Sequence, residues 1–332
     1  MSIRTAVIGV GSMGKNHARV YSDLAGSNLV AIADPQQDSI DYVSSRYHIP
    51  GYKDYIEMLE VEKPQAVTIA VPTSLHRDVA LTAMEKGADI LIEKPIAATI
   101  EEANEIINKA NELGRILMIG HIVRFNSALQ ELKRRLDAGE LGRVFQIFCR
   151  RAGPFPARIR DVGVVVDLAP HDIDVMRYLI GKNPKRVYAE TEQRIHTEHE
   201  DMLFAIMRFP EGITGALEIN WLTPTKIREV LVLGERGLFR VDDLTQDLYF
   251  YENAHANGEL WAGLRVLKGV SEGAMVRYPI QRYEPLKAEL ETFLKAVAGE
   301  SKNPVTGEDG LAALKLALDL VKSGKSHQVI EV

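Results

Sequence analysis

The stretch Gly9-Val10-Gly11-Ser12-Met13-Gly14 decides the fold, because it follows an apolar run and opens a helical pattern. The preceding run, Ala6–Gly9, is short and β-rich, and Ala18, Tyr21 and Ala25 recur on one helical face afterwards. Glycines at the first, third and sixth positions allow a tight turn, a close backbone approach to a pyrophosphate, and close helix–strand packing. The N–H groups and positive dipole at such a helix start attract phosphate. The stretch therefore predicts a dinucleotide-binding turn.

An acidic residue stands where such a turn needs one. Asp34 follows the second apolar run, Leu29–Ala33, about twenty residues beyond the glycines. A carboxylate there accepts hydrogen bonds from a ribose 2′-hydroxyl and repels a 2′-phosphate, so we expect NAD rather than NADP. Two other interpretations stay open: a glycine-rich turn without a nucleotide, and an aspartate that serves only the turn before Pro35.

Short apolar runs alternate with helical patterns over the first 120 residues. The runs are unbroken rather than alternating, which is typical of strands covered on both faces of a parallel sheet. Thr99 with Glu102 forms a capping box that predicts a helix start. We predict an α/β fold whose residues 1–122 form a doubly wound, N-terminal NAD-binding Rossmann domain. The candidate strands are Ala6–Gly9, Leu29–Ala33, Ala66–Val71, Ile90–Ile92 and Ile116–Ile119.

The pattern changes after His121. Residues 185–241 read as consecutive strands separated by turns, which favours a largely antiparallel sheet. We predict that residues 123–332 form a C-terminal α+β domain with a large, mostly antiparallel sheet, for substrate binding and oligomerisation. One expected helix ends at Gly139 and is followed by a strand up to Arg150. Further helices are expected at about Leu168–Ile180, at Leu286–Val297 and at Leu311–Ser323.

Bulk composition excludes several classes of protein. The formal net charge of −6 gives no general attraction to nucleic acid or to an anionic membrane. A single cysteine, Cys149, permits no intramolecular disulfide and reads as a small buried strand residue. No signal-peptide pattern and no apolar run of about 18 residues is present, so we expect a cytoplasmic protein with no nucleic-acid or membrane partner.

Three further segments follow predicted strands, where ligands bind in an open α/β sheet. They are Val71-Pro72-Thr73-Ser74-Leu75-His76, Glu93-Lys94-Pro95, and Gly120-His121 leading to Arg124. With the glycine turn they supply the candidate cofactor-binding residues: Gly9, Gly11, Ser12, Met13, Gly14, Asp34, Val71, Pro72, Thr73, His76, Glu93 and Lys94.

Together these segments resemble the glucose–fructose oxidoreductase / inositol dehydrogenase (Gfo/Idh/MocA) family along essentially the whole chain. Further matches are Asp167 with His171 and the tail 303–310, Asn-Pro-Val-Thr-Gly-Glu-Asp-Gly. The resemblance implies that Lys94 lies beside the nicotinamide and substrate, and that Asp167 and His171 form the family's Asp-x-x-x-His element. Where many members have a run of glycines before that element, this chain reads Arg160-Asp161-Val162-Gly163-Val164-Val165-Val166.

The implied catalytic residues are Lys94, His171 and Asp167. Asp167 and His171 are one helical turn apart, so both can face one cleft. The carboxylate can keep one imidazole nitrogen protonated while the other takes the hydroxyl proton, a transfer in which Lys94 shares. The plainer interpretations are a hydrogen-bonded histidine at a helix start and a solvated surface lysine. No metal is expected, and residues 196–201, although rich in potential ligands, read as a solvated turn.

Five arginines and no acidic residue occur between positions 143 and 160: Arg143, Arg150, Arg151, Arg158 and Arg160. Because arginine suits bidentate contact with phosphate, we expect an anionic substrate such as a nucleotide sugar. Arginines exposed on an edge strand or at a subunit interface are the other interpretation. The candidate substrate-binding residues are Arg124, Arg151, Arg158, Arg160 and His171.

The segment Arg151–Gly163 resembles the branch of the family that oxidises the 3-hydroxyl of UDP-N-acetylglucosamine. The expected function is therefore NAD-dependent oxidation of a sugar secondary hydroxyl to a ketone, with that nucleotide sugar as substrate. A dehydrogenase of a neutral polyol or free sugar, such as myo-inositol, is the alternative within enzymes. A non-catalytic NAD-binding regulator is a further alternative outside the enzymes. The resemblance also implies a homodimer or homotetramer.

Overall fold

The computed structural model describes residues 2–155, 163–195, 198–255 and 270–332, which fold as two compact units. The first unit comprises residues 1–125 and 283–316, and the second comprises residues 126–282 and 317–332. The first boundary lies close to the predicted one after residue 122. The second differs from the prediction, because residues 283–316 return to the N-terminal unit.

The first unit contains a six-stranded sheet in the order β3-β2-β1-β4-β5-β6, and every neighbouring pair is parallel. The chain runs outward from β1 to one edge and then from β4 to the other, so the order reverses between β1 and β4. Such a reversal point is where an open α/β sheet binds its ligand. The predicted parallel sheet is confirmed. Its strands are β1 Ile3–Ile8, β2 Ser27–Ala33, β3 Gly51–Tyr52, β4 Ala66–Ile69, β5 Asp89–Glu93 and β6 Leu117–Gly120.

The helices of this unit begin and end where local signals place them. The hydroxyl of Thr99 accepts a hydrogen bond from the Glu102 N–H at 3.1 Å, as the capping box predicts, and Gly114 closes the same helix with φ 61°. The helices are α1 Ser12–Asp23, α2 Gln37–Tyr47, α3 Tyr55–Glu62, α4 His76–Glu85 and α5 Ile100–Leu113, with short 3₁₀ turns η1 Thr73–Leu75 and η2 Ile122–Phe125.

Residues 283–316 belong to the first unit through contacts far apart in sequence. Helix α8 (Pro285–Val297) packs against α1 and η2. The Ile119 N–H donates to the Val305 carbonyl at 3.1 Å, and the Asn303 side-chain amide donates to the Leu117 carbonyl at 2.6 Å. These hydrogen bonds tie the segment to β6. Helix α9 (Gly307–Ser326) then begins in the first unit and ends in the second.

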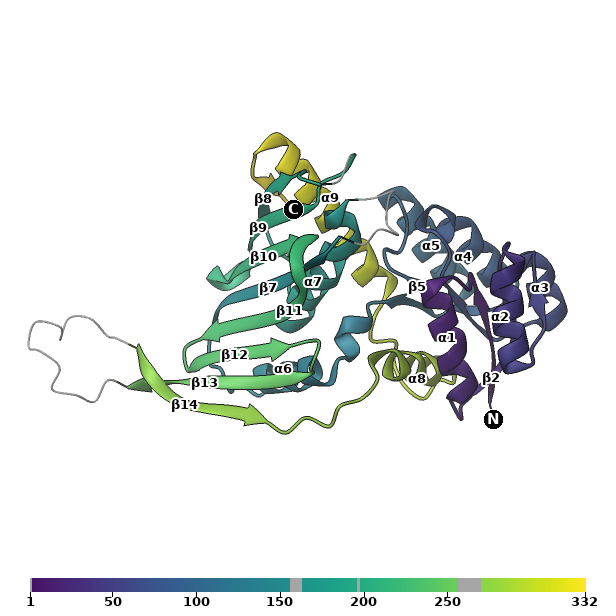
Figure 1. Cartoon of the computed structure of the whole chain (residues 1–332), viewed down its shortest axis with the longest axis horizontal. Helices are drawn as coiled ribbons and strands as arrows, with labels where there is room; N and C mark the ends of the chain where they lie inside the picture. Colours follow the sequence, from purple (N-terminus) through teal and green to yellow (C-terminus); the bar gives the residue numbers. More distant parts are fainter. Residues whose placement is uncertain (1, 156–162, 196–197, 256–269) are drawn as a thin grey trace, which may run out of the picture. The chain divides into compact units, whose positions relative to one another are not determined.

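The second unit contains a nine-stranded sheet in the order β14-β13-β12-β11-β7-β10-β9-β8-β15 (Figure 1). Only the central pair β7–β10 is parallel, so the predicted, mostly antiparallel sheet is confirmed. The sequence interpretation ended this sheet near residue 241 and missed its last three strands. The strands are β7 Val144–Pro154, β8 Arg186–Glu192, β9 Met202–Arg208, β10 Thr214–Asn220, β11 Leu222–Gly234, β12 Gly237–Asp242, β13 Asp247–His255, β14 Val270–Tyr278 and β15 Ile330–Glu331.

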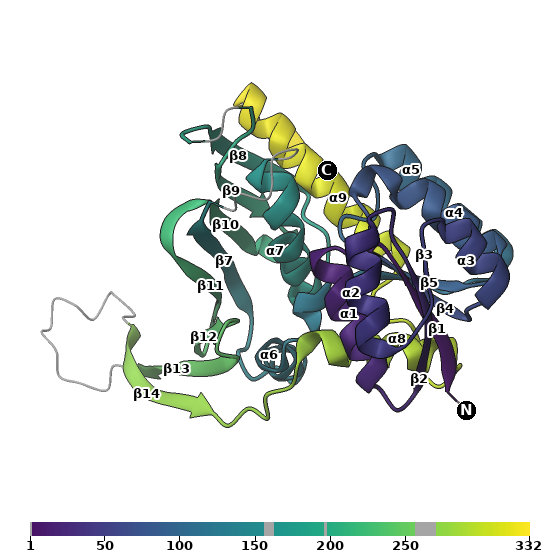
Figure 2. The ribbon, with the colours of Figure 1, turned by 45° about the vertical axis from the view of Figure 1, so that its right-hand side comes forward.

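Helices cover one face of this sheet. Helix α7 (Val164–Ile180) contacts β7, β9 and β10, and α6 (Ser127–Asp137) contacts β12 and β13 (Figure 2). Along β9 the side chains of Leu203, Ala205 and Met207 are buried under the helices, whereas Phe204 and Ile206 are exposed on the opposite face. The alternation shows that the sheet has one covered and one open face.

Helix α7 starts at Val164, four residues before the predicted start at Leu168. Glu200 makes the earlier start possible, because its carbonyl accepts from the Val164 N–H at 2.9 Å and its carboxylate from the Val165 N–H at 3.3 Å. These bonds satisfy N–H groups that a helix start leaves without an intrahelical partner.

None of the helices in the described parts of the chain combines the length and the apolar character that a membrane span requires.

Candidate active site

The glycine turn connects β1 to α1 as predicted. Gly9 has φ 84°, and a side-chain Cβ there would lie 2.7 Å from the Ala70 carbonyl oxygen. A Cβ on Gly14 would lie 1.8 Å from the Gly9 carbonyl oxygen. A Cβ on Gly11 would meet nothing within 4 Å. The chain itself therefore requires the outer two glycines, whereas bare backbone at Gly11 leaves space for a bound molecule.

Helix α1 begins at this space and carries no side-chain cap at Gly11. Its first N–H groups and its dipole are thus directed toward an anion. The turn fits the pyrophosphate of a dinucleotide on both counts, space and charge.

Asp34 lies at the end of β2 and is tied to the same turn. One carboxylate oxygen accepts from the Val10 N–H at 2.8 Å, and the other accepts from the Gln36 N–H at 2.8 Å. An ionised carboxylate has about four acceptor positions, so two bonds leave room for ribose hydroxyls. Asp34 therefore forms the turn and also suits the predicted contact with ribose.

His76 joins two of the predicted cofactor segments. It is buried at the start of α4, with Nδ1 2.9 Å from the Pro95 carbonyl oxygen and Nε2 3.0 Å from that of Val71. Burial lowers the pKa of His76, so the ring is neutral at pH 7 and donates to one of these carbonyls at a time. Because both nitrogens face main-chain oxygens, His76 holds the segments beginning at Val71 and Glu93 together.

The Glu93-Lys94-Pro95 turn follows β5, at the same edge of the sheet as the glycine turn. His17, fully buried on α1, places its Nε2 2.8 Å from a Glu93 carboxylate oxygen, and the other oxygen accepts from the Lys94 N–H at 3.3 Å. Burial alone would raise the pKa of Glu93, but the hydrogen bond and charge of His17 and the charge of Lys94 hold it below its ordinary value. The Lys94–Pro95 peptide is cis, and Lys94 is half-buried.

His17 was missed from the sequence, although it follows the last glycine by three residues and lies one helical turn before Tyr21. That spacing places both side chains on the buried face of α1. A buried polar residue on such a face needs a partner, and here the partner is the carboxylate next to Lys94.

A second buried carboxyl lies near Glu93. Glu289 on α8 is fully buried, and neither of its carboxyl oxygens has a hydrogen-bond partner among the residues that the structure describes. Burial, together with the negative charge of Glu93, raises the pKa of Glu289 well above its ordinary value. The pKa values of the two carboxyls are therefore shifted in opposite directions, that of Glu93 downward and that of Glu289 upward.

Glu289→Gln is expected to stabilise the protein at pH 8 and to have little effect at pH 4.5. The unfolded carboxyl ionises near pH 4.5 but the folded one only at higher pH, so stability is lost as pH rises between these two values. The loss is about 1.4 kcal/mol for each unit of pKa difference. Thermal unfolding of both proteins from pH 4.5 to 8 tests this, and parallel curves would show that Glu289 is already ionised in the folded state.

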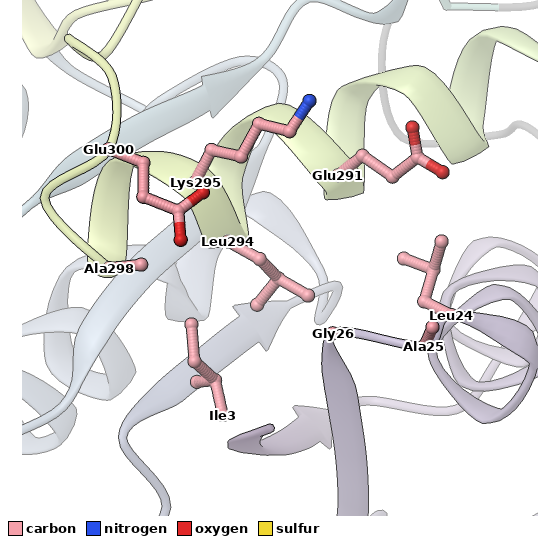
Figure 3. A pocket seen from close by; sticks show the side chains of 9 residues that line it. All are labelled: Ile3, Leu24, Ala25, Gly26, Glu291, Leu294, Lys295, Ala298 and Glu300. Atoms are coloured by element: carbon pink, nitrogen blue, oxygen red, sulfur yellow. The ribbon is translucent and has the colours of Figure 1, made fainter. Parts of the chain in front are cut away.

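A pocket of about 360 Å³ lies at the opposite end of the six-stranded sheet (Figure 3). Ile3 and the residues before β2 form one side, and side chains of α8, including Leu294 and Lys295, form the other. Ile3 begins β1, whereas the glycine turn follows its end. Because ligands of open α/β sheets bind beyond the carboxyl ends of the strands, this pocket is not the cofactor site.

In the second unit, the predicted catalytic pair lies on α7. Asp167 is in the first turn of this helix, where the dipole favours a negative charge, and His171 follows four residues later. Both side chains are partly exposed, whereas Asp172 and Asp174 are buried. The helical spacing places Asp167 and His171 on one face, as the sequence predicts.

Arg151 has a buried partner that the sequence interpretation missed. Its Nε lies 2.6 Å from one carboxylate oxygen of Asp172, and its Nη2 lies 3.1 Å from the other. Arg150 and Arg143 likewise pair with acids from other segments, at 2.9 Å from Glu218 and 3.3 Å from Glu235. Acids that are distant in sequence thus neutralise this part of the cluster, and the Arg151 fork is occupied by the protein itself.

Arg124 is also held by the protein. Its Nη1 donates to the Pro304 carbonyl at 3.1 Å and lies 3.2 Å from a carboxylate oxygen of Asp309. This ion pair links η2 to the tail 303–310 within the first unit. The other two predicted substrate-binding arginines, Arg158 and Arg160, lie outside the described residues, as do His196 and Thr197 of the predicted solvated turn.

Cys149 is buried on β7, as predicted, and burial raises the pKa of its thiol well above the ordinary value. Within residues 2–155, 163–195, 198–255 and 270–332, no three histidine, cysteine or acidic side chains are grouped so that they could hold a metal ion.

Comparison with known proteins identifies the family. Residues 3–121 match the model of the GFO/IDH/MocA oxidoreductase family with an NAD-binding Rossmann fold, and residues 129–240 match the GFO/IDH/MocA C-terminal domain. The chain belongs to the GFO/IDH/MocA family. Its first unit is accordingly an NAD-binding Rossmann domain, and the resemblance seen in the sequence is confirmed.

Relatives in the family include enzymes with different substrates. The chain is 31% identical over 319 residues to a UDP-N-acetylglucosamine 3-dehydrogenase of Acidithiobacillus ferrooxidans, covering 96% of each protein. It is 36% identical over 343 residues to the scyllo-inositol 2-dehydrogenase (NAD⁺) of Bacillus subtilis, covering 99% of this chain and 96% of the relative. A solved structure of the Acidithiobacillus enzyme superposes with a TM-score of 0.85 at 28% identity, covering 98% of this chain and 99% of that one. Membership in a family of sugar oxidoreductases is therefore shown.

Proposed function

We propose that the protein oxidises a secondary hydroxyl of a sugar to a ketone with NAD⁺, and that its substrate is UDP-N-acetylglucosamine, oxidised at the 3-hydroxyl. The observation that carries the proposal is the position of Lys94. It follows β5 at the sheet edge where the glycine turn and Asp34 form the cofactor site. The full-length similarity to the Acidithiobacillus enzyme supports the choice of substrate.

The residues of the chain have distinct roles in this proposal. The backbone N–H groups of the glycine turn hold the pyrophosphate, and Asp34 holds the ribose. Bound NAD⁺ would supply the acceptor for the hydride of the carbon that bears the reacting hydroxyl. Lys94 hydrogen-bonds the reacting oxygen, and His171 takes its proton, while Asp167 keeps the imidazole in the accepting tautomer. His17 and Glu93 position the backbone at Lys94.

A dehydrogenase of a neutral polyol or free sugar is the second candidate, because the scyllo-inositol enzyme is 36% identical to this chain. The two candidates share the roles of Lys94, His171 and the cofactor turn, and they differ only in what recognises the rest of the substrate. A non-catalytic NAD-binding regulator would not need Lys94 and His171, and the chain has both.

A UDP-N-acetylglucosamine analogue that lacks the 3-hydroxyl tests the position of oxidation. The analogue keeps the diphosphate and the uracil, so it is expected to bind and to inhibit competitively without producing NADH. NADH formed from this analogue would show that a different hydroxyl reacts. Absence of inhibition would show that the enzyme does not recognise the nucleotide sugar.

We also propose that the open face of the nine-stranded sheet is the surface through which the chain forms a homodimer or homotetramer. Ile206 on β9 is 55% exposed and pairs in register with Ala216 on β10 and Tyr188 on β8. Phe204 is exposed on the same face. Large apolar side chains exposed on one face of a sheet support a contact site there.

A further inference from the structure

Strand β11 brings a second arginine beside Arg151. In the β7–β11 register Arg228 is opposite Arg151, and residues opposite one another in a ladder share a face of the sheet. Val230 and Val232 lie two and four residues after Arg228, so the three side chains point to the same face of the sheet. Both valines are buried. Arg228 therefore lies on the covered face, the same face as α7.

The hydrogen bonds of Arg228 use only part of its guanidinium. Nη1 donates to the main-chain carbonyls of Ala152 and Ile227, each at 2.7 Å. Within the described parts of the chain, Arg228 makes no ion pair with a carboxylate, and its Nε and Nη2 have no acceptor. Arg151, by contrast, is bound at both positions by Asp172. Three of the five N–H donors of Arg228 thus remain available.

The surroundings do not compensate the charge of Arg228. Burial and the neighbouring positive charge of Arg151 lower the pKa of Arg228 to about 10, although three carboxylates act in the opposite direction: Asp172, Asp243 and Asp167. The carboxylate of Asp172 is already bonded to Arg151, and that of Asp243 accepts a hydrogen bond from the Asn126 side-chain amide at 2.7 Å and lies 3.9 Å from Nη2 of Arg151. A partly buried cation without a direct partner is costly, and a bound anion would remove that cost.

We infer that Arg228 binds the negatively charged group of the substrate, a phosphate or a carboxylate, through Nε and Nη2. The planar fork of arginine matches both groups. Asp167 is close enough for its charge to act on Arg228, which places this contact near the proposed catalytic pair on α7. The inference rests on the proposed function in taking this side of α7 as the substrate side. It transfers to Arg228 the anion-binding role that the sequence assigns to Arg151.

Binding of unreactive ligands to Arg228→Gln, Arg228→Lys and a control tests the inference. Arg236→Gln is the matched control, because Arg236 is exposed in the β11–β12 turn of the same hairpin. Calorimetric titration with UDP and with glucuronate, both in the presence of NADH, separates a phosphate from a carboxylate. We expect UDP to bind about 10- to 100-fold more weakly to Arg228→Gln than to wild type. Arg228→Lys should lie between them, because it keeps the charge and loses the fork.

The outcomes separate the inference from the proposed function. An unchanged Tm together with an unchanged NADH affinity shows that both units of a variant are folded. Weaker glucuronate binding with unchanged UDP binding would identify a carboxylate as the ligand and support the inference. Equal affinities of wild type and Arg228→Gln for both ligands, or no binding of either ligand to wild type, would overturn it.

If wild type binds UDP through Arg228 but does not oxidise UDP-N-acetylglucosamine, the proposed function fails and the inference stands. If Arg228→Gln oxidises that substrate with an unchanged KM, the inference fails and the function stands.

Discussion

Replacing Lys94 by alanine is expected to lower kcat by about 10²- to 10⁴-fold, the range typical of a lost acid–base group. The effect should fall on kcat rather than on the affinity for NADH, because in the proposed function the glycine turn and Asp34 hold the pyrophosphate and the ribose. Lys94→Arg should not restore activity, since a guanidinium stays protonated and cannot relay a proton. Steady-state kinetics together with NADH fluorescence titration measure both quantities.

Lys86→Ala is the control for loss of a lysine in the same domain. Lys86 is exposed at the end of α4, where it pairs with Glu60 at 2.7 Å. This variant should keep wild-type kinetics, because a surface ion pair contributes little. If Lys94→Ala retains more than about a tenth of wild-type kcat, a loss smaller than acid–base catalysis gives, Lys94 does not act on the reacting oxygen.

Two glycine substitutions in one turn are expected to fail in different ways. In Gly14→Ala the new Cβ would lie 1.8 Å from the Gly9 carbonyl oxygen, so helix and strand must separate. We expect a loss of more than about 3 kcal/mol of folding free energy, seen as a large fall in Tm or as insoluble protein. In Gly11→Ala the Cβ enters open space, so Tm should stay near wild type.

The Gly11→Ala variant should nevertheless bind NADH about 10- to 100-fold more weakly, because the methyl group occupies the space proposed for the pyrophosphate. Fluorescence titration of NADH on the folded variant gives this value. Wild-type NADH affinity in Gly11→Ala would mean that the dinucleotide does not approach the backbone there. A stable Gly14→Ala protein would contradict the packing of α1 on β1.

Local signals in the sequence predict the first unit well. The glycine turn, the unbroken strands and the Thr99 capping box each act over a few residues, and the structure reproduces all three. The two-residue strand β3 was missed, because Gly51 and Tyr52 carry no pattern that could reveal a strand. The place of Lys94 after β5 follows from the same local order.

The features that the sequence did not predict depend on contacts between residues far apart along the chain. Residues 283–316 join the first unit through hydrogen bonds to β6, which no periodicity announces. The arginines near residue 150 have no acidic residue in their own segment, yet Asp172, Glu218 and Glu235 pair with three of them. Arg228, which lies in register with Arg151, could be found only once β11 was placed beside β7.

The same limitation applies to the residues that surround Lys94. His17 and Glu289 are polar residues on the otherwise largely apolar buried faces of α1 and α8. The sequence offers no sign that one of them bonds Glu93 or that burial raises the pKa of the other. Both properties arise because three segments separated along the chain bury these side chains together.

The production of NADH from UDP-N-acetylglucosamine tests the central claim most directly. Purified protein would be mixed with NAD⁺ and this nucleotide sugar, with a carbonyl-trapping reagent to remove the ketone, and NADH absorbance followed. Free N-acetylglucosamine, glucose, myo-inositol and scyllo-inositol would be assayed in parallel. We expect NADH with the nucleotide sugar alone. NADH formed from an inositol or a free sugar, with none from UDP-N-acetylglucosamine, would contradict the proposed function.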